Sequence, residues 1–171
     1  MVSYNPLWHN IAQQEIEFLH GILGEDVLIE HFGSTAIIGC QAKDIVDIQI
    51  WAANNETVNR IKQILLPIYQ RVSSPEKQAI GFLCFDKEVE IDDQIRRTHH
   101  IHIQSNWEKW QSGIYFRDYL NDHPNEVVKY EQVKLAAIQQ FPQDMTAYSK
   151  MKDNYIASVI HKAKKFYKGV F

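Results

Sequence analysis

The feature that most constrains this fold is an apolar segment with one acid inside it. Residues 45–51 read Ile-Val-Asp-Ile-Gln-Ile-Trp, and such a run with little alternation is typical of a strand buried on both faces. Asp47 lies within this strand, where a bare buried charge would be very costly. Its carboxylate must therefore be hydrogen-bonded, neutralised or bound to a cation, and the sequence leaves a structural and a metal-binding aspartate equally open.

A glycine-serine turn precedes this strand within the segment His31-Phe32-Gly33-Ser34-Thr35. Such a turn exposes backbone N–H groups and a small hydroxyl, so a phosphate group can approach it closely. Twelve residues lie between Ser34 and Asp47, and Gly39 gives the intervening chain freedom to reverse. We therefore expect a short helix or turn at Gly33-Ser34, above the C-terminal end of the Asp47 strand.

Length and composition indicate one ordinary globular domain. The chain has 171 residues, a formal net charge of -3 and a pI near 6.2, which gives no general attraction to nucleic acid or anionic lipid. No apolar run approaches the roughly 20 residues that span a bilayer, and the N-terminal residues lack the pattern of a signal peptide. Cys40 and Cys84 have no spacing pattern and are expected to be buried free thiols. These features predict a cytoplasmic protein that does not bind membranes.

Periodicity predicts an α+β fold, with a small mixed sheet backed by helices and a helical C-terminal half. The single domain 1–171 would divide into an α/β core at about 1–105 and a helical part at about 106–171. Asn54 and Pro124 are expected at helix starts, and Gly24 at a helix end. The expected helices are 8–22, with Phe18 on its buried stripe, 54–68, 107–121, 124–141 and 145–168, the last burying Phe166. The expected strands are 27–32, 45–51, 80–85 and 98–104, with a loop at 71–78 and a turn or exposed strand end at 86–93.

The chain closely resembles the GrpB family over nearly its whole length. The matching residues are Glu30-His31-Phe32-Gly33-Ser34-Thr35-Ala36, Gly39, Ala42-Lys43, Ile45-Val46-Asp47-Ile48, His100-Ile101-His102, Phe116-Arg117-Asp118-Tyr119-Leu120, Tyr130, Lys134, Tyr148 and Lys152. The turn followed by a strand acid also resembles the phosphate-and-metal half of polymerase-beta-type nucleotidyltransferases. These resemblances imply a nucleotidyltransferase-like fold, although the activity of the GrpB family is largely uncharacterised.

The carboxylates depart from the nucleotidyltransferase pattern. Nucleotidyl transfer normally needs two acids on same-face positions of one strand and a third acid nearby, which together hold two Mg²⁺ ions. Here Asp47 occupies the first position, but Gln49 occupies the second. A third acid would have to come from Asp86, Glu88 or Glu90. The residues therefore predict a site for Mg²⁺ or Mn²⁺ at Asp47, with weak or absent transfer.

Two histidines form a second candidate constellation. His100 and His102 are two apart in a predicted strand, so they share a face, while His99 should point away into solvent. Paired histidines can bind a transition metal or contact phosphate, and we expect His102 to face the same cleft as Asp47. A zinc site lacks a third ligand with supporting spacing. With His31 nearby, the same residues would suit a metal-dependent phosphoester hydrolase.

Several other residues are candidate phosphate contacts. Arg117 can contact phosphate, or it can form a structural bridge with Asp118 between the helical half and the sheet. Lys134 and Lys152 can both face the cleft, but for Lys152 a solvated helix face is the expectation. The full set of candidate phosphate-binding residues is His31, Gly33, Ser34, Thr35, Lys43, His100, His102 and Arg117, with Asp47 as the candidate catalytic and metal-binding residue.

The sequence favours binding of a nucleotide or another phosphorylated small molecule with a divalent cation, with nucleotidyl transfer as the reaction if the protein is an enzyme. The alternatives are a non-catalytic binding or accessory module on the same fold and the hydrolase described above. Nucleic-acid binding is not expected, because the only basic concentration, at residues 162–168, reads as a solvated helix face without interleaved aromatics for base stacking.

Overall fold

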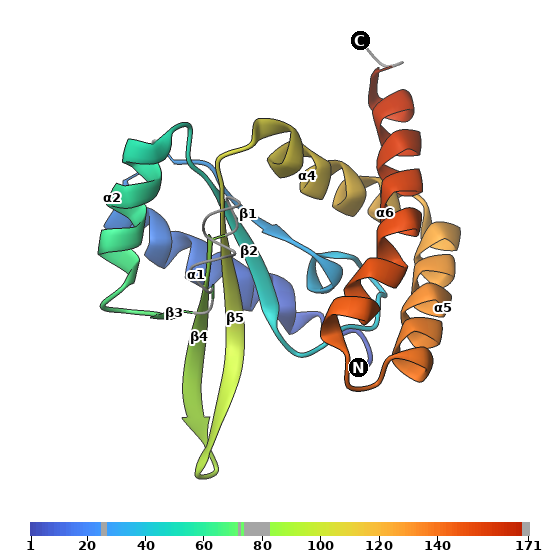
Figure 1. The fold of residues 1–171 in the computed structure, drawn as a ribbon, viewed down its shortest axis with the longest axis horizontal. Coiled ribbons are helices and arrows are strands. Elements are labelled where there is room, and N and C mark those ends of the chain that lie inside the picture. The colour runs from blue at the N-terminus through green and yellow to red at the C-terminus, as the bar shows by residue number, and fades with distance from the viewer. Residues whose placement is uncertain (25–26, 72, 74–82, 169–171) are drawn as a thin grey trace.

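The computed structural model describes residues 1–24, 27–71, 73 and 83–168 (Figure 1). Its strands form one mixed sheet in the order β1-β2-β5-β4-β3, in which β2 and β5 are parallel and the other pairs antiparallel. The elements are α1 (Leu7–Leu23), β1 (Ile29–Phe32), η1 (Ser34–Ala36), β2 (Val46–Trp51), α2 (Asn55–Leu65), β3 (Gln70–Arg71), β4 (Leu83–Ile91), β5 (Gln94–Gln104), α4 (Trp107–Asp122), α5 (Pro124–Gln140) and α6 (Met145–Lys168). The predicted α+β class with a small mixed sheet is confirmed, whereas the domain boundaries stay a prediction.

Helix ends follow the local signals in the sequence. Helix α1 ends at Gly24, whose φ of 99° suits a residue without a side chain. Helix α2 begins after Asn54, whose side chain accepts a hydrogen bond from the backbone N–H of Thr57. Pro124 occupies the first turn of α5, where its missing N–H is harmless. These capping residues account for the agreement between the predicted and observed helices.

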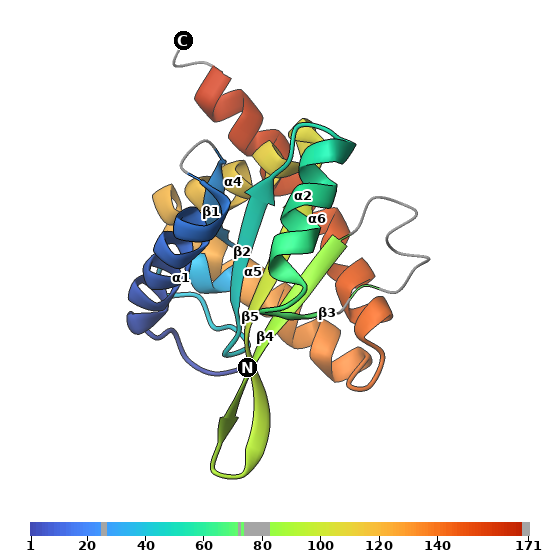
Figure 2. The same ribbon diagram turned by 90° about the vertical axis from the view of Figure 1, so that its left-hand side faces the viewer.

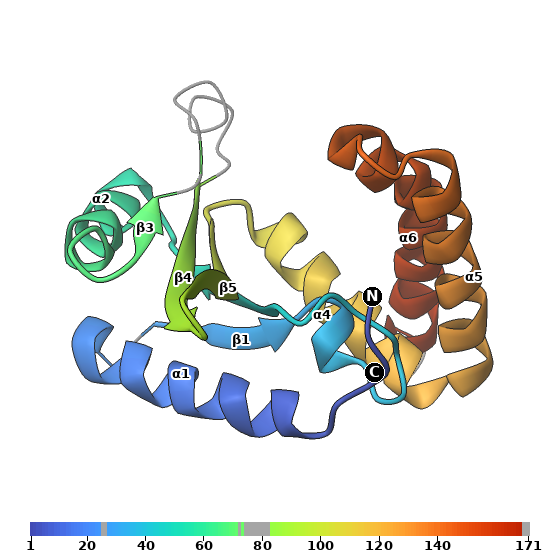
Figure 3. The same ribbon diagram turned by 90° about the horizontal axis from the view of Figure 1, so that it is seen from below.

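Two apolar cores hold the molecule together. Helices α1 and α2 cover one face of the sheet, where Ile48 and Ile101 are fully buried among apolar side chains of both helices (Figure 3). The second core lies among α4, α5 and α6, where Phe116 and Tyr130 pack with Ile37 from the segment after η1. Helix α4 lies between the sheet and α6, so it connects the two cores (Figure 3). The face of the sheet opposite α1 thus meets the helical half of the chain.

The β4–β5 hairpin is longer than predicted and projects beyond the rest of the sheet (Figure 2). Residues 86–91, expected in a turn or strand end, belong to β4. The turn itself lies at Asp92 and Asp93, which have φ values of 52° and 58°. Such left-handed conformations in two adjacent residues suit a tight hairpin turn, and aspartate tolerates them. The expected loop at 71–78 and the first part of the expected strand at 80–85 lie mostly outside the described residues.

Two aromatic side chains predicted to be buried lie on the surface. Phe18 is 44% exposed and carries the ammonium of Lys87 over its ring, and Phe166 is 46% exposed and packs edge-on against His123. Cys40 and Cys84 are buried free thiols, as predicted. Among the residues that the structure describes, none of the helices is both long and apolar enough to cross a membrane.

Candidate functional site

The Gly33-Ser34 turn lies directly against Asp47. Gly33 has a φ of 75°, and a Cβ added to it would lie 2.6 Å from Oδ2 of Asp47, so only glycine fits here without a shift. The predicted proximity is found, but the predicted end of the strand is wrong. Because β1 is antiparallel to β2 and Phe32 pairs with Asp47, the turn lies at the N-terminal end of β2.

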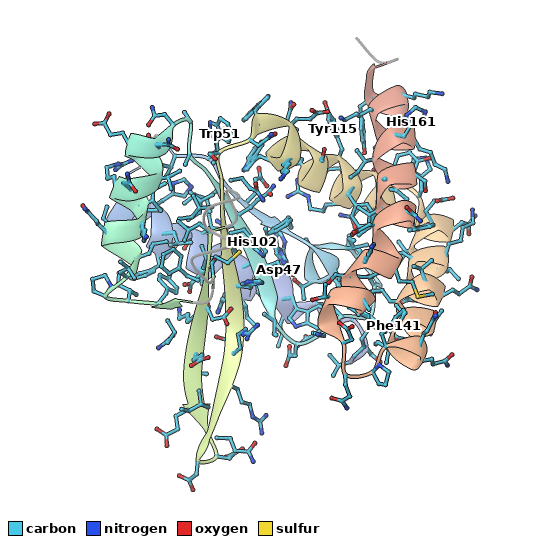
Figure 4. All side chains as sticks on the ribbon, in the orientation of Figure 1. Asp47, Trp51, His102, Tyr115, Phe141 and His161 are labelled. Atoms are coloured by element: carbon cyan, nitrogen blue, oxygen red, sulfur yellow. The ribbon has the colours of Figure 1, made fainter. Side chains whose placement is uncertain are left out.

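Asp47 accepts hydrogen bonds from two histidines of the neighbouring strand. Its Oδ1 lies 3.4 Å from Nδ1 of His100 and 3.4 Å from Nε2 of His102. Figure 4 labels Asp47 and His102. Parallel pairing of β2 with β5 places all three side chains on one face, as strand alternation predicts for His102. Burial raises the pKa of Asp47, but the hydrogen bonds from His100 and His102 outweigh it, so the pKa lies well below its usual range. Asp47 is therefore ionised at neutral pH.

A second acid lies on the same row of the sheet but does not join Asp47. Asp86 of β4 pairs in register with His100, whose Nε2 is 3.9 Å from Oδ1 of Asp86. Because β5 lies between β2 and β4, the imidazole of His100 separates the two carboxylates. Glu88 and Glu90 lie farther along the hairpin, beyond a register shift between Lys87 and Glu88. Asp86 therefore brings a further carboxylate onto the sheet face that carries Asp47, but the two carboxylates are not in contact.

Gln49 does not face the site, although it shares a sheet face with Asp47. Its side chain is 1% exposed and its Nε2 donates to the backbone oxygen of Trp110 at 3.1 Å. A Cβ added to Gly113 would lie 3.1 Å from Oε1 of Gln49, so α4 approaches the sheet closely at this point. Helix α4 therefore covers the position where the second carboxylate of the nucleotidyltransferase pattern would stand.

Three lysines from different elements gather beside the turn. Lys43 and Lys152 both approach the ring of Tyr148, with Nζ at 5.5 and 4.3 Å from its centroid. Lys134 is 1% exposed, and its Nζ lies 4.6 Å from the centroid of Tyr130. Burial lowers the pKa of Lys152, and the charges of Lys134 and Lys43 lower it further, while Asp47 opposes them. The solvated helix face expected for Lys152 is therefore wrong.

Lys134 and Ser34 connect this lysine cluster, defined as Lys43, Lys134 and Lys152, to the turn. The ammonium of Lys134 donates to the backbone oxygen of Gln41 and to Sγ of Cys40, which secures the segment after η1. The hydroxyl of Ser34 lies 3.4 Å from that of Tyr130. The turn therefore meets α5 directly.

Arg117 holds α4 to the sheet. Its guanidinium donates to Glu30 and to the backbone oxygen of His31, both at 2.7 Å, and to the adjacent Asp118 at 2.7 Å. This geometry matches the predicted structural bridge between the helical half and the sheet rather than a contact with a bound phosphate.

Three residues lie apart from the group formed by Asp47, His100 and His102, namely His31, Thr35 and His99. His31 pairs in register with Ile48, so its ring lies on the α1 face, where its Nε2 is 2.9 Å from the hydroxyl of Thr35. Both side chains are buried, and burial lowers the pKa of His31 to about 4. The expected grouping of His31 with the other histidines is therefore wrong. His99 does point away from Asp47, but it is 6% exposed near Glu15 rather than solvated.

A largely apolar cavity of about 470 Å³ opens beside the turn. It lies between α4 and α6, with Phe32 and Gly33 at the sheet side and Tyr130 from α5. The remaining lining residues are Asn106, Glu108, Lys109, Ser112, Gly113, Phe116, Ile156 and Ile160. A planar apolar group with a few polar atoms would fit such a lining.

Cys84 is the neighbour of the histidines that sequence reasoning missed. It pairs in register with His102, and its Sγ lies 3.2 Å from Nδ1 of that histidine. The only trace in the sequence is the alternation Cys84-Phe85-Asp86, which mirrors His100-Ile101-His102. That alternation identifies a face but not the register between the strands, so it cannot place the thiol against His102.

A known protein family matches nearly the whole length of this chain. A family model described as GrpB protein matches residues 1–162. The glutamate-rich protein GrpB of Alkalihalophilus pseudofirmus is 29% identical over 165 residues, which are 94% of this chain and 93% of the relative. The UPF0157 protein YqkA of Bacillus subtilis is 29% identical over 171 residues, and the match covers 99% of this chain but only 48% of that relative.

Solved structures show the same fold. The crystal structure of the conserved protein GrpB from Enterococcus faecalis has a TM-score of 0.78 at 29% identity and covers 97% of this chain and 98% of its own. The Cid1 poly(U) polymerase with MgGTP bound has a TM-score of 0.53 at 9% identity, over 88% of this chain and 50% of that chain. The predicted nucleotidyltransferase-like fold is thereby confirmed, and at this identity the similarity to Cid1 extends to the fold alone.

Proposed function

This chain belongs to the GrpB family, and we propose that it binds a nucleotide or another phosphorylated small molecule between the sheet and the helical half. The observation that carries this proposal is the lysine cluster beside the Gly33-Ser34 turn. Lys43 and Lys152 share one tyrosine ring, although like charges repel at this range. A phosphate group placed among them would relieve that repulsion and accept hydrogen bonds from both ammonium groups.

The turn and the cavity supply the rest of the proposed ligand site. The backbone of Gly33 and the hydroxyl of Ser34 can donate to phosphate oxygens, as small residues in a turn do. The cavity begins at Gly33 and is lined by Phe116 and Tyr130, which suits a base or another planar group. The fold shared with Cid1, whose structure holds MgGTP, makes nucleoside triphosphates the first ligands to test.

We propose binding rather than nucleotidyl transfer because the residues do not fit a pair of Mg²⁺ ions. Mg²⁺ demands oxygen ligands in octahedral geometry. Asp47 offers one carboxylate that is already held by two imidazoles, and Gln49 is buried beneath α4. A single Mg²⁺ or Mn²⁺ ion entering with the phosphates would have Asp47 as its carboxylate ligand. The hydrolase is not favoured, because His31 lies on the other face.

Thermal-shift and calorimetric titration test the proposal. The panel contains ATP, GTP, UTP, pyrophosphate and ribose 5-phosphate, each with and without Mg²⁺ or Mn²⁺. A true ligand at about 100 times its dissociation constant should stabilise the fold by roughly 2.7 kcal/mol. Lys152→Ala should weaken binding by about tenfold or more, equivalent to about 1.4 kcal/mol. Lys150→Ala is the matched control, because Lys150 is exposed on the same helix.

Two results would contradict the proposal. One is that no compound of the panel binds the folded protein. The other is that Lys152→Ala and Lys150→Ala bind the best compound equally well. A pyrophosphate-release assay with nucleoside triphosphates tests the absence of transfer separately. Robust transfer that survives Asp47→Asn would show that chemistry occurs elsewhere in the chain.

A further inference from the structure

We propose that Cys84, His100 and His102 form a transition-metal site, suited to Zn²⁺, with Asp86 as its fourth ligand. The proposal goes beyond phosphate binding and does not depend on it, because these residues lie on the β4–β5 hairpin rather than at the lysine cluster.

Strand pairing brings the four side chains together. Cys84 pairs with His102 and Asp86 pairs with His100, so alternate residues of two antiparallel strands form a square on one face of the hairpin. One ligand atom each from Cys84, His100 and His102 lies within 4.8 Å of the other two. In a tetrahedral zinc site the ligand bonds are about 2.0–2.3 Å, so neighbouring ligand atoms stand roughly 3–4 Å apart. Small side-chain movements would therefore bring these three atoms onto one ion.

The ligand types determine which metal is expected. Thiolate and imidazole prefer borderline ions such as Zn²⁺, whereas Mg²⁺ prefers oxygen. Cys84 must lose its thiol proton when the metal binds, so binding releases a proton to solvent. The set of one thiolate, two imidazoles and one carboxylate thus selects zinc over the magnesium that the fold class suggests.

The surroundings of the histidines resemble those of metal ligands. The two nitrogens of His102 have different neighbours, since Nδ1 is 3.2 Å from Sγ of Cys84 and Nε2 is 3.4 Å from Oδ1 of Asp47. A histidine that binds metal through one nitrogen commonly donates its other N–H to a carboxylate, which fixes the ring. Asp47 would then be a positioning residue of the metal site.

Asp86 supplies an independent observation. It is 3% exposed and its Oδ2 pairs with Arg97 at 2.6 Å. Its Oδ1 is buried, makes no hydrogen bond with any of the described residues and lies 3.9 Å from Nε2 of His100. A buried carboxylate oxygen without a partner is costly. A metal ion held by the neighbouring imidazole and thiolate would satisfy this oxygen.

The test uses the full chain and metal alone, without nucleotide. Chelator-treated protein is titrated with Zn²⁺ by calorimetry and with Co²⁺ by absorbance, and Mg²⁺ serves as the comparison ion. We expect one Zn²⁺ per chain, no comparable binding of Mg²⁺, and a thiolate-to-cobalt charge-transfer band with Co²⁺. The unmodified protein alone can overturn the proposal if it binds no Zn²⁺ or if its cobalt complex lacks that band.

Matched variants locate the site. Cys84→Ser should abolish the charge-transfer band and most of the Zn²⁺ affinity, whereas Cys40→Ser, at the other buried thiol, should retain both. His102→Gln should likewise lose Zn²⁺, with His161→Gln on the exposed face of α6 as its control (Figure 4). Asp47→Asn should weaken Zn²⁺ binding by about 10- to 100-fold through loss of ring positioning. Retention of the band in folded Cys84→Ser would overturn the assignment.

Failure here is distinguishable from failure of the proposed function. Lys152→Ala should bind Zn²⁺ like the unmodified protein, because its ammonium lies over the Tyr148 ring rather than at the hairpin. A protein that binds Zn²⁺ but none of the phosphorylated compounds would support this inference and contradict the phosphate proposal. A protein that binds a phosphorylated compound but no Zn²⁺ would support the phosphate proposal and contradict this inference.

Discussion

The two faces of the β2–β5 strand pair carry opposite kinds of residue within the same few positions. The α1 face presents Ile48 and Ile101, which are fully buried in the main core. The other face presents Asp47 with His100 and His102, whose imidazoles both contact its carboxylate, and these side chains are only partly buried, with 30%, 22% and 14% exposed. Adjacent residues of one strand therefore serve stability and chemistry separately, because successive side chains point to opposite faces.

This comparison predicts that the largest stability change comes from the core face. Ile101→Ala should lower the free energy of unfolding by about 2–5 kcal/mol, since it leaves a cavity in a fully buried site. His100→Ala, one position away and partly exposed, should cost much less. Urea denaturation of both variants measures the difference, and equal losses would contradict the division between the faces.

Acidification should reveal the histidine that lies on the core face. Burial lowers the pKa of His31 from 6.5 to about 4, so folding favours its neutral form. Above pH 6.5 this histidine is neutral in both the folded and the unfolded state. As the pH falls from 6.5 to about 4 the unfolded state alone binds the proton, so the free energy of unfolding falls by about 3 kcal/mol. His31→Gln should flatten this part of the stability curve, and His161→Gln should not. An unchanged curve in His31→Gln would place the acid sensitivity elsewhere.

Gln49 lies on the site face but should respond like a core residue. Gln49→Glu should destabilise the protein by about 1–3 kcal/mol at pH 7, because it turns a donor into a buried charge facing the backbone oxygen of Trp110. Gln104→Glu, on the same face and partly exposed, is the control. Denaturation at pH 7 compares the two variants. An unchanged free energy of unfolding in Gln49→Glu would show that α4 does not exclude water from this position.

The smallest effect should come from the turn at the edge of the site. Gly33→Ala and Gly39→Ala both place a side chain at positive φ, at 75° and 77°. At Gly33 the added Cβ meets Asp47, whereas at Gly39 it meets no atom within 4 Å in the part of the chain that the structure describes. Gly33→Ala should therefore cost about 1 kcal/mol more than Gly39→Ala in thermal unfolding. Gly33→Ala should also weaken ligand binding. Equal losses of stability in the two variants would indicate that the turn accommodates the added Cβ without displacing Asp47.

Local patterns predicted most of the helices and half of the site. Alternation within residues 98–104 placed His100 and His102 on one face, and the predicted placement of His102 toward Asp47 is met through parallel pairing of β2 with β5. The same reasoning failed for His31 and Lys152. Their positions depend on which face of β1 meets α1 and on how α6 packs beside the sheet, and both depend on contacts between distant parts of the chain.

What the sequence by itself determined is the set of elements, their caps and the faces of individual strands, because these depend on neighbours a few residues apart. The tertiary structure alone decided the strand order, the register of Cys84 and Asp86 against the histidines, and the burial of Gln49 beneath α4. A shift of register by one residue would turn every side chain of a strand to the other face without changing its local pattern. Pairing between segments far apart in the chain therefore decided which side chains share the site.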